Sequence, residues 1–373
     1  MSSAVSRIAQ HARSGEGAWF RAPGRVNLIG DHTDYNDGFV LPVAIDSECV
    51  VAARPAETIR VASIELGESI ELPADGGDVE SSVSMWGRLV AAIAQELSAL
   101  GRPPAGMDAV VATDVPIGAG LSSSAAFEVA CALSLADAAE WRADSTALAV
   151  ACRNAEERAT GVPCGVMDQL VVMHGRGGCA LLIDCRTLET KAVPIPQRIG
   201  LLVVHSGQER TLAESEYAER RRACEALAQR LGVRALRDAT LAQVADDPLG
   251  RHVVTENGRV LEAASALEDG DLVALGRLMN ASHESLRDDY RVSTQELDIL
   301  VEALVEAGAL GARLTGAGFG GAVVAVCDAH EVAAVGGAAT ARYRALTGLE
   351  PRTFACRAVD GAGPLERAPS GSF

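Results

Sequence analysis

The amino-acid sequence predicts an α+β protein built of two domains. The chain has 373 residues, which is long for one domain and suits two. Hydrophobic residues make up 48% of it, enough for buried cores. The alternation of strand-like and helix-like segments changes after Pro194-Ile195-Pro196, a short segment that suits a crossing between domains. We therefore expect one domain at residues 1–193 and a second at residues 194–373.

Charge and cysteine content narrow the class of protein. A formal net charge of −17 argues against a surface for nucleic acid or for an anionic membrane. No apolar run reaches the roughly 18 to 20 residues of a membrane span, and the first residues lack the layout of a signal peptide. The nine cysteines contain no Cys-x-x-Cys pair, so neither a zinc site nor a disulfide framework is indicated. We expect a reduced, cytoplasmic protein, and a monomer.

The N-terminal part begins with a polar lead-in over residues 1–18 and then carries a dense cluster of hydrogen-bonding side chains. Strand-like pieces at Val26–Ile29 and Phe39–Ile45 flank the cluster, so we expect it on a loop held by a sheet. Its members are Arg25, Asn27, Asp31, His32, Asp34, Tyr35 and Asn36. Such a cluster suits a polyol ligand, because each hydroxyl needs a donor and an acceptor. The alternative is a turn at Asn36-Asp37-Gly38, which accounts for the end of the cluster only.

Two strands, a helix and a third strand follow. Cys49–Arg54 and Thr58–Ile64 have strand patterns, and Met85–Leu100 has helical spacing with Gly101 as a stop signal. A short strand at Ala109–Ala112 then leads into a glycine-rich loop. Strand, glycine turn and helix is the order that a phosphate-binding turn requires.

The loop itself is Pro116-Ile-Gly-Ala-Gly-Leu-Ser-Ser-Ser-Ala125, and an apolar segment, Ala126–Ala139, follows it. A helix that starts near Ser122 would direct its free N–H groups and positive dipole end at the turn, as in many phosphate sites. An ordinary serine-rich helix cap is the alternative. The loop is not a Walker loop, because the single lysine of the chain, Lys191, lies outside it.

Two acids stand near the next helix. Ser145–Ala159 is expected to be helical, with Glu156 near its end. Asp168 lies among apolar neighbours, where burial raises the pKa of a carboxylate unless positive charge or hydrogen bonds oppose it. Such an acid either takes part in function or bonds a buried backbone N–H. A strand at Gly178–Asp184 closes the first half.

The second half is predicted to alternate between a few strands and many helices. Its expected elements are a strand at Ile199–His205, a helix at Leu212–Leu231, mostly helix over 239–308, a strand at Ala322–Cys327, a helix near 330–345 and a strand near 352–357. A second glycine-rich segment, Arg313–Gly321, precedes the strand at Ala322–Cys327. It is either a tight entry into a sheet or part of a site.

Three stretches together resemble the motifs of the GHMP small-molecule kinases. They are Gly24–Asn36, Pro116–Ala126 and Leu314–Gly321, in that order. The first is more specific, because Gly-Asp-His-Thr-Asp-Tyr resembles the signature of the galactokinases. Pro163–Gln169 and Ser215–Arg221 are also similar to galactokinase segments, so the resemblance covers nearly the whole chain.

The resemblance implies an ATP-dependent sugar 1-kinase with its active site in the cleft between two domains. The N-terminal domain would hold a mixed sheet with helices, and the C-terminal domain would be ferredoxin-like. Galactose and ATP would be the substrates, and Mg²⁺ the metal ion.

The resemblance also implies a role for each matching position. Catalysis would depend on a base and a neighbouring arginine, Asp168 and Arg25. The sugar would contact Asp31, His32, Thr33, Asp34, Gly165 and Tyr217. The ATP phosphates would lie on the loop residues Gly118, Ala119, Gly120, Leu121, Ser122, Ser123 and Ser124. The adenine and ribose would lie near Trp86 and Ser63. The magnesium ion, which prefers oxygen ligands and keeps several waters, would be held by Ser124 and Glu156.

One residue departs from the family pattern, and two other functions stay open. Asp31 stands where galactokinases usually have glutamate, and its side chain is one methylene shorter. The chain could therefore be a 1-kinase for a related sugar such as L-arabinose or N-acetylgalactosamine. It could also be a sugar-sensing regulator of the same fold, but the joint presence of Asp168, Arg25 and Glu156 speaks against a protein without catalysis.

Overall fold

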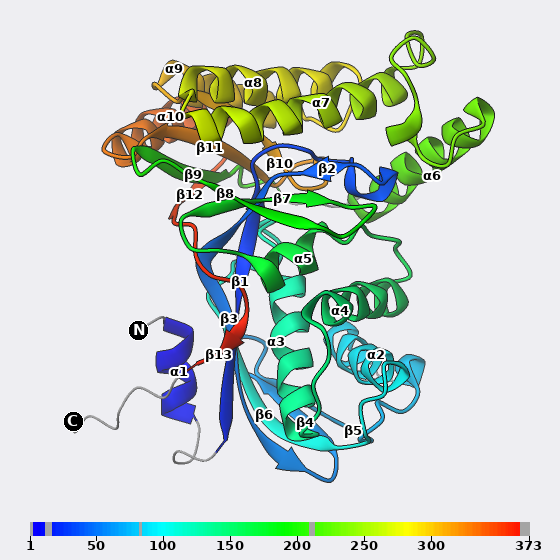
Figure 1. The fold of residues 1–373 in the computed structure, drawn as a ribbon. Helices are drawn as coiled ribbons and strands as arrows, with labels where there is room; N and C mark the ends of the chain where they lie inside the picture. Colours follow the sequence, from blue (N-terminus) through cyan, green and yellow to red (C-terminus); the bar gives the residue numbers. More distant parts are fainter. Residues whose placement is uncertain (1–2, 12–16, 82–83, 209–212, 366–373) are drawn as a thin grey trace.

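The protein is an α+β fold of three β-sheets with helices packed against them, as its computed structural model shows (Figure 1). The structure describes residues 3–11, 17–81, 84–208 and 213–365. The largest sheet fills the lower part of Figure 1, a three-stranded sheet crosses the middle, and a four-stranded sheet lies under helices at the top. The predicted fold class is confirmed.

The largest sheet is mixed, as predicted for the N-terminal part. Its strand order is β13-β1-β3-β6-β4-β5. In chain order these strands are β1 (Ala18–Asn27), β3 (Pro42–Ala56), β4 (Ile59–Ser63), β5 (Glu68–Leu72), β6 (Gly106–Thr113) and β13 (Gly363–Pro364). Only β4 and β6 pair in parallel; the other neighbours in this sheet are antiparallel. The strands at residues 49–54, 58–64 and 109–112 were thus predicted in the right places.

Four helices cover one face of this sheet: α2 (Met85–Ala99), α3 (Ser123–Ala138), α4 (Ser145–Thr160) and α5 (Met167–His174). The sequence explains their ends. Ser84 caps α2 by accepting a hydrogen bond from the N–H of Gly87, and Asp144 caps α4 through the N–H groups of Thr146 and Ala147. Gly161 ends α4 in the left-handed conformation that glycine adopts without strain. The predicted helices at 85–100, near 122–139 and 145–159 are confirmed.

The expectation of a polar lead-in at residues 1–18 was wrong. Ser3–His11 forms a helix, α1, on the opposite face of the large sheet (Figure 1), and Ala18 already belongs to β1. Ala4 and Ile8 are fully buried against Val50 and Ala112, so one apolar stripe fixes this short helix. Residues 12–16 of the expected lead-in lie outside the described residues.

The middle sheet joins distant parts of the chain. Its strands are β2 (Phe39–Val40), β7 (Cys179–Asp184) and β8 (Thr190–Pro194), in the order β2-β7-β8. The predicted strand at 178–184 is confirmed by β7. The helix α7 (Pro248–Asp269), which lies in the second half of the sequence, packs against β2 and β8. This sheet therefore holds the predicted polar loop, which precedes β2, against a helix of the second half.

The four-stranded sheet has the ferredoxin-like arrangement that the resemblance implied. Its strands are β9 (Ile199–His205), β10 (Gly311–Thr315), β11 (Ala322–Asp328) and β12 (Arg352–Cys356), in the order β10-β11-β9-β12 with every pair antiparallel. The order of elements is strand, helices, two strands, helix, strand. Its helices are α8 (Leu272–Asp288), α9 (Gln295–Glu306) and α10 (Val332–Thr347).

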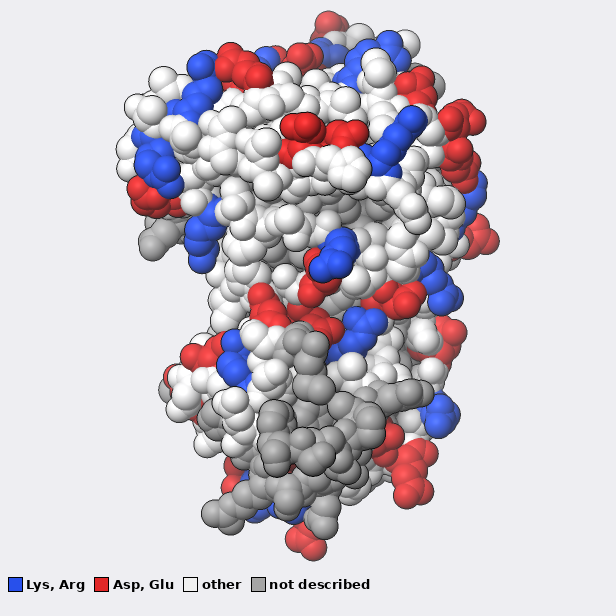
Figure 2. All heavy atoms as spheres, turned by 90° about the vertical axis from the view of Figure 1, so that its left-hand side faces the viewer, with Lys and Arg blue, Asp and Glu red and all other residues white. Residues whose placement is uncertain are grey.

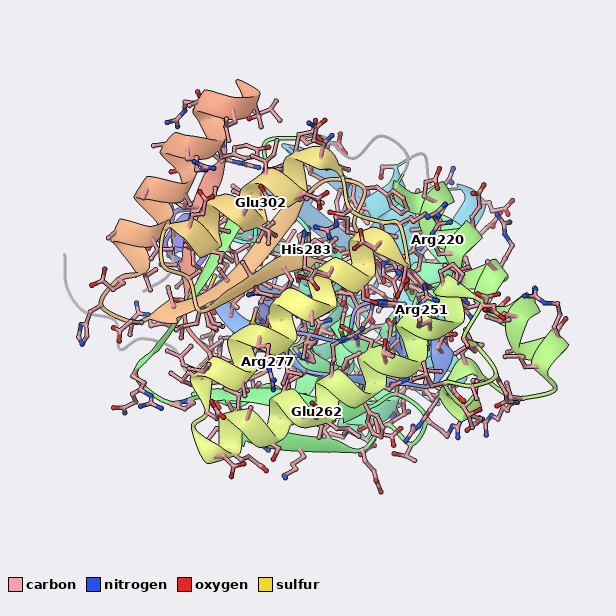
Figure 3. All side chains as sticks on the ribbon, turned by 90° about the horizontal axis from the view of Figure 1, so that it is seen from above. Arg220, Arg251, Glu262, Arg277, His283 and Glu302 are labelled. Atoms are coloured by element: carbon pink, nitrogen blue, oxygen red, sulfur yellow. The ribbon has the colours of Figure 1, made fainter. Side chains whose placement is uncertain are left out.

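Seen from above, α7 and α8 lie side by side, as do α9 and α10 (Figure 3). The predicted helix at 212–231 is α6 (Ala213–Leu231), and Leu212 lies outside the described residues. Short 3₁₀ helices occupy Asp34–Asn36, Val79–Ser81 and Leu236–Asp238. One hydrophobic cluster continues from β1 and α3 of the N-terminal half to α7 and β11 of the C-terminal half, so the two halves share a core. The predicted domain boundary between residues 193 and 194 stays a prediction.

The surface carries both signs of charge. On the face shown in Figure 2, arginine and lysine side chains lie among aspartates and glutamates. Across the described ranges, no helix is both long enough and apolar enough to cross a lipid bilayer.

Candidate active site

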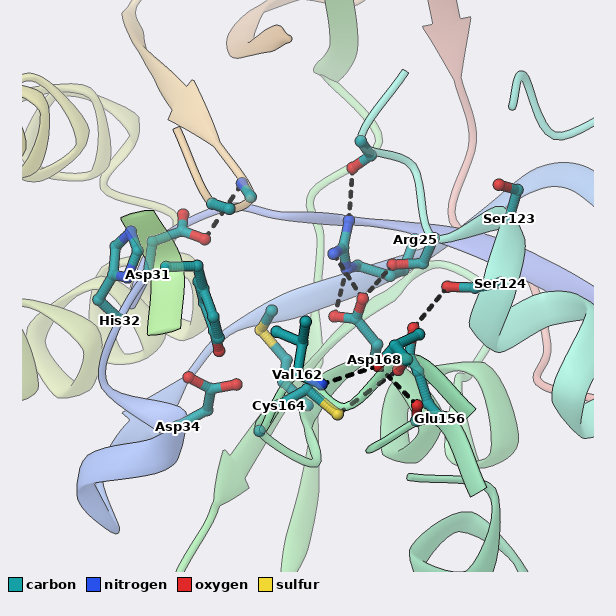
Figure 4. Close-up of a pocket in the computed structure, with 18 of the residues that line it drawn as sticks. Arg25, Asp31, His32, Asp34, Ser123, Ser124, Glu156, Val162, Cys164 and Asp168 are labelled. Carbon is teal, nitrogen blue, oxygen red and sulfur yellow. Dashed lines mark hydrogen bonds and ion pairs between the residues drawn. The ribbon is translucent and has the colours of Figure 1, made fainter. Parts of the chain in front are cut away.

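A pocket of about 760 Å³ lies where the polar loop, the glycine-rich loop and the second glycine-rich segment meet. Side chains and backbone from both halves of the chain line it (Figure 4). Of the residues predicted from the sequence, the lining includes Arg25, Asp31, His32, Asp34, Gly118, Gly120, Ser122, Ser123, Ser124, Glu156, Gly165, Asp168 and Tyr217. Segments far apart in the sequence thus converge on one cavity.

The glycine-rich loop has the backbone that a phosphate site needs. Gly118 and Gly120 have φ angles of 75° and 78°, in the region that glycine adopts without strain. Ser122 also has a positive φ, 57°, and α3 begins at the next residue. The carbonyl of Gly120 accepts a hydrogen bond of 2.6 Å from Nη1 of Arg25, which fixes the loop to β1. The N-terminus of α3 therefore opens into the pocket with its free N–H groups.

Arg25 and Asp168 form a bidentate ion pair in this pocket. Nε of Arg25 donates to Oδ1 of Asp168 at 2.7 Å, and Nη2 donates to Oδ2 at 2.6 Å. Burial alone would lower the pKa of Arg25, but the charge and hydrogen bonds of Asp168 outweigh it and raise the pKa. The hydroxyl of Ser122 donates a further hydrogen bond to Asp168. The carboxylate is thus held between β1 and the glycine-rich loop.

Glu156 lies beside this pair and meets the loop from the other side. Its Oε1 accepts a hydrogen bond of 2.9 Å from the hydroxyl of Ser124, and its Oε2 accepts one of 2.9 Å from the amide of Gln169. Burial, and next the charge of Asp168, raises the pKa of Glu156. A buried carboxylate and a hydroxyl next to a phosphate-type loop can together bind a hard cation.

The polar loop supplies the opposite wall of the pocket. His32 has a φ of 65°, and its Nδ1 lies 2.8 Å from the hydroxyl of Tyr35. Burial lowers the pKa of His32 to about 3, so the ring is neutral. A hydrogen bond with the backbone of Ala317, in the second glycine-rich segment, opposes this lowering in part. The ring centroid of Tyr217, on α6, lies 5.7 Å from that of His32, and the two ring planes are tilted by 39°.

Asp34 and Asp31 have different settings on the same loop. Burial, and next the charge of Asp168, raises the pKa of Asp34 to about 7. Asp31 forms a hydrogen-bonded ion pair with the fully buried Arg313, and its Oδ1 accepts the N–H of Gly316 at 3.1 Å. Asp31 therefore lines the pocket and also fastens the polar loop to the second glycine-rich segment.

Three side chains of α7 hold the polar loop from behind. Oε1 of Glu256 accepts the N–H of Gly30 at 2.9 Å, and Oδ1 of Asn257 accepts the N–H of Phe39 at 2.8 Å. Nε2 of His252 lies 3.2 Å from the carbonyl oxygen of Asp31. These residues were not predicted. The helical spacing of a segment does not show which distant loop it will contact, and Glu256 lies 226 residues after Gly30.

Five predicted residues do not line this pocket. Ala119 and Leu121 are fully buried, although their loop surrounds the pocket. The hydroxyl of Thr33 donates to the carbonyls of Gly30 and Phe39 at 2.8 and 2.7 Å, so it holds the shape of the polar loop. Ser63 ends β4 and accepts the N–H of Leu66. The indole N–H of Trp86 donates to Glu68 at 2.9 Å, and its ring packs edge-on against Phe127.

Two further residues next to the site were missed. Glu128 and Gln169 are both fully buried, and Nε2 of Gln169 donates to Oε2 of Glu128 at 2.9 Å. The signal for Glu128 was present, since it is an acid inside the apolar segment 126–139, as Asp168 is an acid among apolar neighbours. Burial, and next the charge of Glu156, raises the pKa of Glu128 well above its usual range.

Comparisons with known proteins agree over nearly the whole chain. Residues 9–55 match the galactokinase galactose-binding signature, residues 88–176 the N-terminal domain of the GHMP kinases, and residues 263–345 their C-terminal domain. Galactokinases of Roseiflexus sp. (strain RS-1) and Chloroflexus aurantiacus are each 45% identical to the chain, with 92% of both partners covered.

The solved structures agree with these relatives. The structure of Lactococcus lactis galactokinase complexed with galactose matches with a TM-score of 0.89 and 31% identity, and the match covers 96% of this chain and 98% of that one. A mevalonate kinase of Methanococcus jannaschii, at 19% identity and a TM-score of 0.68, shares the fold.

Proposed function

The chain belongs to the galactokinase family of the GHMP kinases, and on that premise we propose that it transfers the terminal phosphoryl group of ATP to the anomeric hydroxyl of galactose, giving galactose 1-phosphate and ADP. The observation that supports this reaction most is the ion pair of Arg25 and Asp168, which lies between the polar loop and the N-terminus of α3. A sugar on one side and a phosphate on the other would meet at this pair.

Each wall of the pocket would then have its own task. Asp31, His32, Asp34 and Tyr217 would bind sugar hydroxyls. The N–H groups of the glycine-rich loop would bind phosphate oxygens. Asp168 would orient the anomeric hydroxyl and accept its proton as the bond to phosphorus forms. Arg25 and the N-terminus of α3 would stabilise the negative charge of the transition state.

The residues also fit a magnesium ion. A carboxylate oxygen of Glu156 and the hydroxyl of Ser124 lie 2.9 Å apart, and both are oxygen ligands of the kind that magnesium prefers. The charge of the neighbouring Asp168 acts on Glu156, and a bound cation would offset the repulsion between these two acids. Within the described ranges, no three His, Cys, Asp or Glu side chains converge on a metal position. The protein would thus give few ligands, with phosphates and water completing the shell. A bound ion would neutralise charge on the transferred group.

A coupled assay of ADP release across a panel of monosaccharides tests the proposal. We expect galactose to be the best substrate and phosphate to appear on its anomeric oxygen, as read by ³¹P and ¹³C NMR. A clear preference for L-arabinose or N-acetylgalactosamine would change the proposed substrate but leave the proposed reaction, phosphoryl transfer to a sugar, unchanged. If sugars bind but none of them leads to release of ADP from ATP, the protein is not a kinase.

We further propose a monomer in the cytoplasm, with a boundary between residues 193 and 194. All nine cysteines are free, seven of them buried, which supports a reducing compartment. β8 ends at Pro194, one residue past this boundary, and β9 begins at Ile199. Light scattering would test the monomer, and limited proteolysis the boundary.

A further inference from the structure

One buried amide joins two acids beside the candidate metal site. Nε2 of Gln169 donates to Oε2 of Glu128 on α3 and to Oε2 of Glu156 on α4, at 2.9 Å in both cases. Gln169 and Glu128 have no exposed surface. Oε1 of Glu128 and Oε1 of Gln169 have no partner among the described residues, so these two hydrogen bonds are what the amide contributes here.

These contacts fix both oxygens of Glu156. Oε1 accepts the hydroxyl of Ser124 and Oε2 accepts Gln169, so neither end of the carboxylate turns freely. A glutamate has three rotatable side-chain bonds, and ordering it costs about 1.5 to 2 kcal/mol of conformational entropy. In this structure that cost is met during folding. Glu156 is therefore held in one orientation before any ligand arrives.

Gln169 is also the direct neighbour of Asp168 in the first turn of α5. Asp168 contacts Arg25 and Ser122, while Gln169 contacts Glu156 and Glu128. A single helical turn therefore sets the separation between the candidate base and the candidate metal ligand. Replacing Gln169 would leave the contacts of Asp168 in place and take from Oε2 of Glu156 its 2.9 Å hydrogen bond. The weak thiol donor of Cys164, 3.6 Å away, would remain on that oxygen, and the hydroxyl of Ser124 on the other.

We propose that Gln169 is a positioning residue for the magnesium site, which holds Glu156 toward Ser124 and takes its own place from Glu128. The inference rests on the proposed function, because it needs Glu156 to bind the metal ion. Gln169 lies behind Glu156 and touches neither substrate in this scheme. Residues that orient metal ligands in this way typically change metal affinity or activity by about tenfold to a hundredfold when they are replaced.

The test is Gln169→Leu, which keeps the approximate volume and removes the amide. Binding of Mn²⁺, as a probe for magnesium, would be measured by electron paramagnetic resonance in the presence of a non-hydrolysable ATP analogue. We expect the Kd for Mn²⁺ to rise by about tenfold to a hundredfold. Galactose affinity, measured by calorimetry without metal or nucleotide, should stay within about twofold. In the kinase assay, high Mg²⁺ should restore part of the lost turnover.

Two control variants separate orientation from general loosening. Glu128→Gln keeps an oxygen that accepts from Gln169, so Mn²⁺ binding should stay within about threefold. Ser134→Ala removes another buried hydrogen bond of α3, from the Ser134 hydroxyl to the Ala130 carbonyl at 2.8 Å, and should leave Mn²⁺ binding unchanged. If Gln169→Leu does not fold, Gln169→Asn takes its place, because the shorter amide cannot reach both acids.

A Glu156→Gln arm distinguishes the two ways in which the inference can fail. If Glu156→Gln weakens Mn²⁺ binding and the Gln169 variant does not, the orienting role is wrong and the magnesium assignment stands. If neither variant weakens it, both the inference and the assignment of Glu156 are wrong. An equal loss in Ser134→Ala would also overturn the inference, because the effect would then be general.

Discussion

A β-carbon on Gly165 would lie 1.7 Å from Oδ2 of Asp34. The segment before α5 therefore approaches the polar loop as closely as glycine allows. We expect Gly165→Ala to push the carboxylate of Asp34 out of position and to weaken galactose binding by about tenfold or more, the scale of a lost hydrogen bond to a charged group. Calorimetry with galactose measures the change.

Gly337→Ala is the matched control, since a β-carbon there meets nothing within 4 Å and Gly337 lies on α10, far from the pocket. Equal galactose affinity in Gly165→Ala and wild type would mean that Asp34 does not contact the sugar.

Asp168→Asn tests the base. The substitution keeps the size of the side chain and an oxygen for Arg25, but an amide cannot accept the proton of the sugar hydroxyl. We expect turnover to fall by roughly 10² or more, as general bases contribute, with galactose still bound. Steady-state kinetics beside a galactose titration gives both values. Near-normal turnover in a variant that binds galactose would rule out proton transfer to Asp168.

The raised pKa of Asp34 predicts how stability depends on pH. Burial, and next the charge of Asp168, moves the pKa from the ordinary 3.8 to about 7 in the folded protein. Between these values the folded state holds a proton that the unfolded chain has lost. This contribution to stability is therefore full below the unfolded pKa and is lost as pH rises through about 7.

We expect the free energy of unfolding of the ligand-free protein to fall between about pH 5 and 7.5 more steeply in wild type than in Asp34→Asn. The difference should be roughly 1 to 2 kcal/mol, because solvent reaches the pocket and reduces the full effect. Urea denaturation at the two pH values measures it. Parallel curves for the two proteins would contradict the assigned pKa.

The ion pair of Asp31 and Arg313 predicts a non-additive pair of substitutions. Arg313 has no exposed surface, so removing one partner leaves a buried charge without its counterion. Asp31→Asn and Arg313→Met should each lower the free energy of unfolding by about 3 to 5 kcal/mol, and the double variant should recover much of the loss. Thermal melting of the four proteins supplies the cycle. Additive losses would show that the two side chains act independently.

The sequence predicted most elements, and its errors have identifiable causes. Helices with a cap and an apolar face, such as the one that begins after Ser84, came out close to their bounds. The helix at Ser3–His11 was missed because only two of its side chains, Ala4 and Ile8, are fully buried. Three residues of β10, Arg313, Leu314 and Thr315, were read as part of a glycine-rich segment, although all three are buried strand.

The site could be predicted only as far as its residues lie in motifs. Arg25, Asp168 and the glycine-rich loop fall in one pocket, as the sequence implied. Contacts between distant segments could not be predicted, because they depend on how sheets and helices pack. The ion pair of Arg313 with Asp31 and the hydrogen bond from Gln169 to Glu156 are contacts of this kind.

Because α7 is hydrogen-bonded to the polar loop, two backbone amides of the loop can report a long-range contact in hydrogen–deuterium exchange. The N–H of Gly30 is bonded by Glu256, 226 residues away, and the N–H of Phe39 by Asn257, 218 residues away. A hydrogen-bonded amide takes up deuterium from solvent only when its bond opens. The rate of deuterium uptake at these two amides therefore reports how often the loop separates from a remote helix. At an amide bonded within its own turn, the rate reports only the opening of that turn.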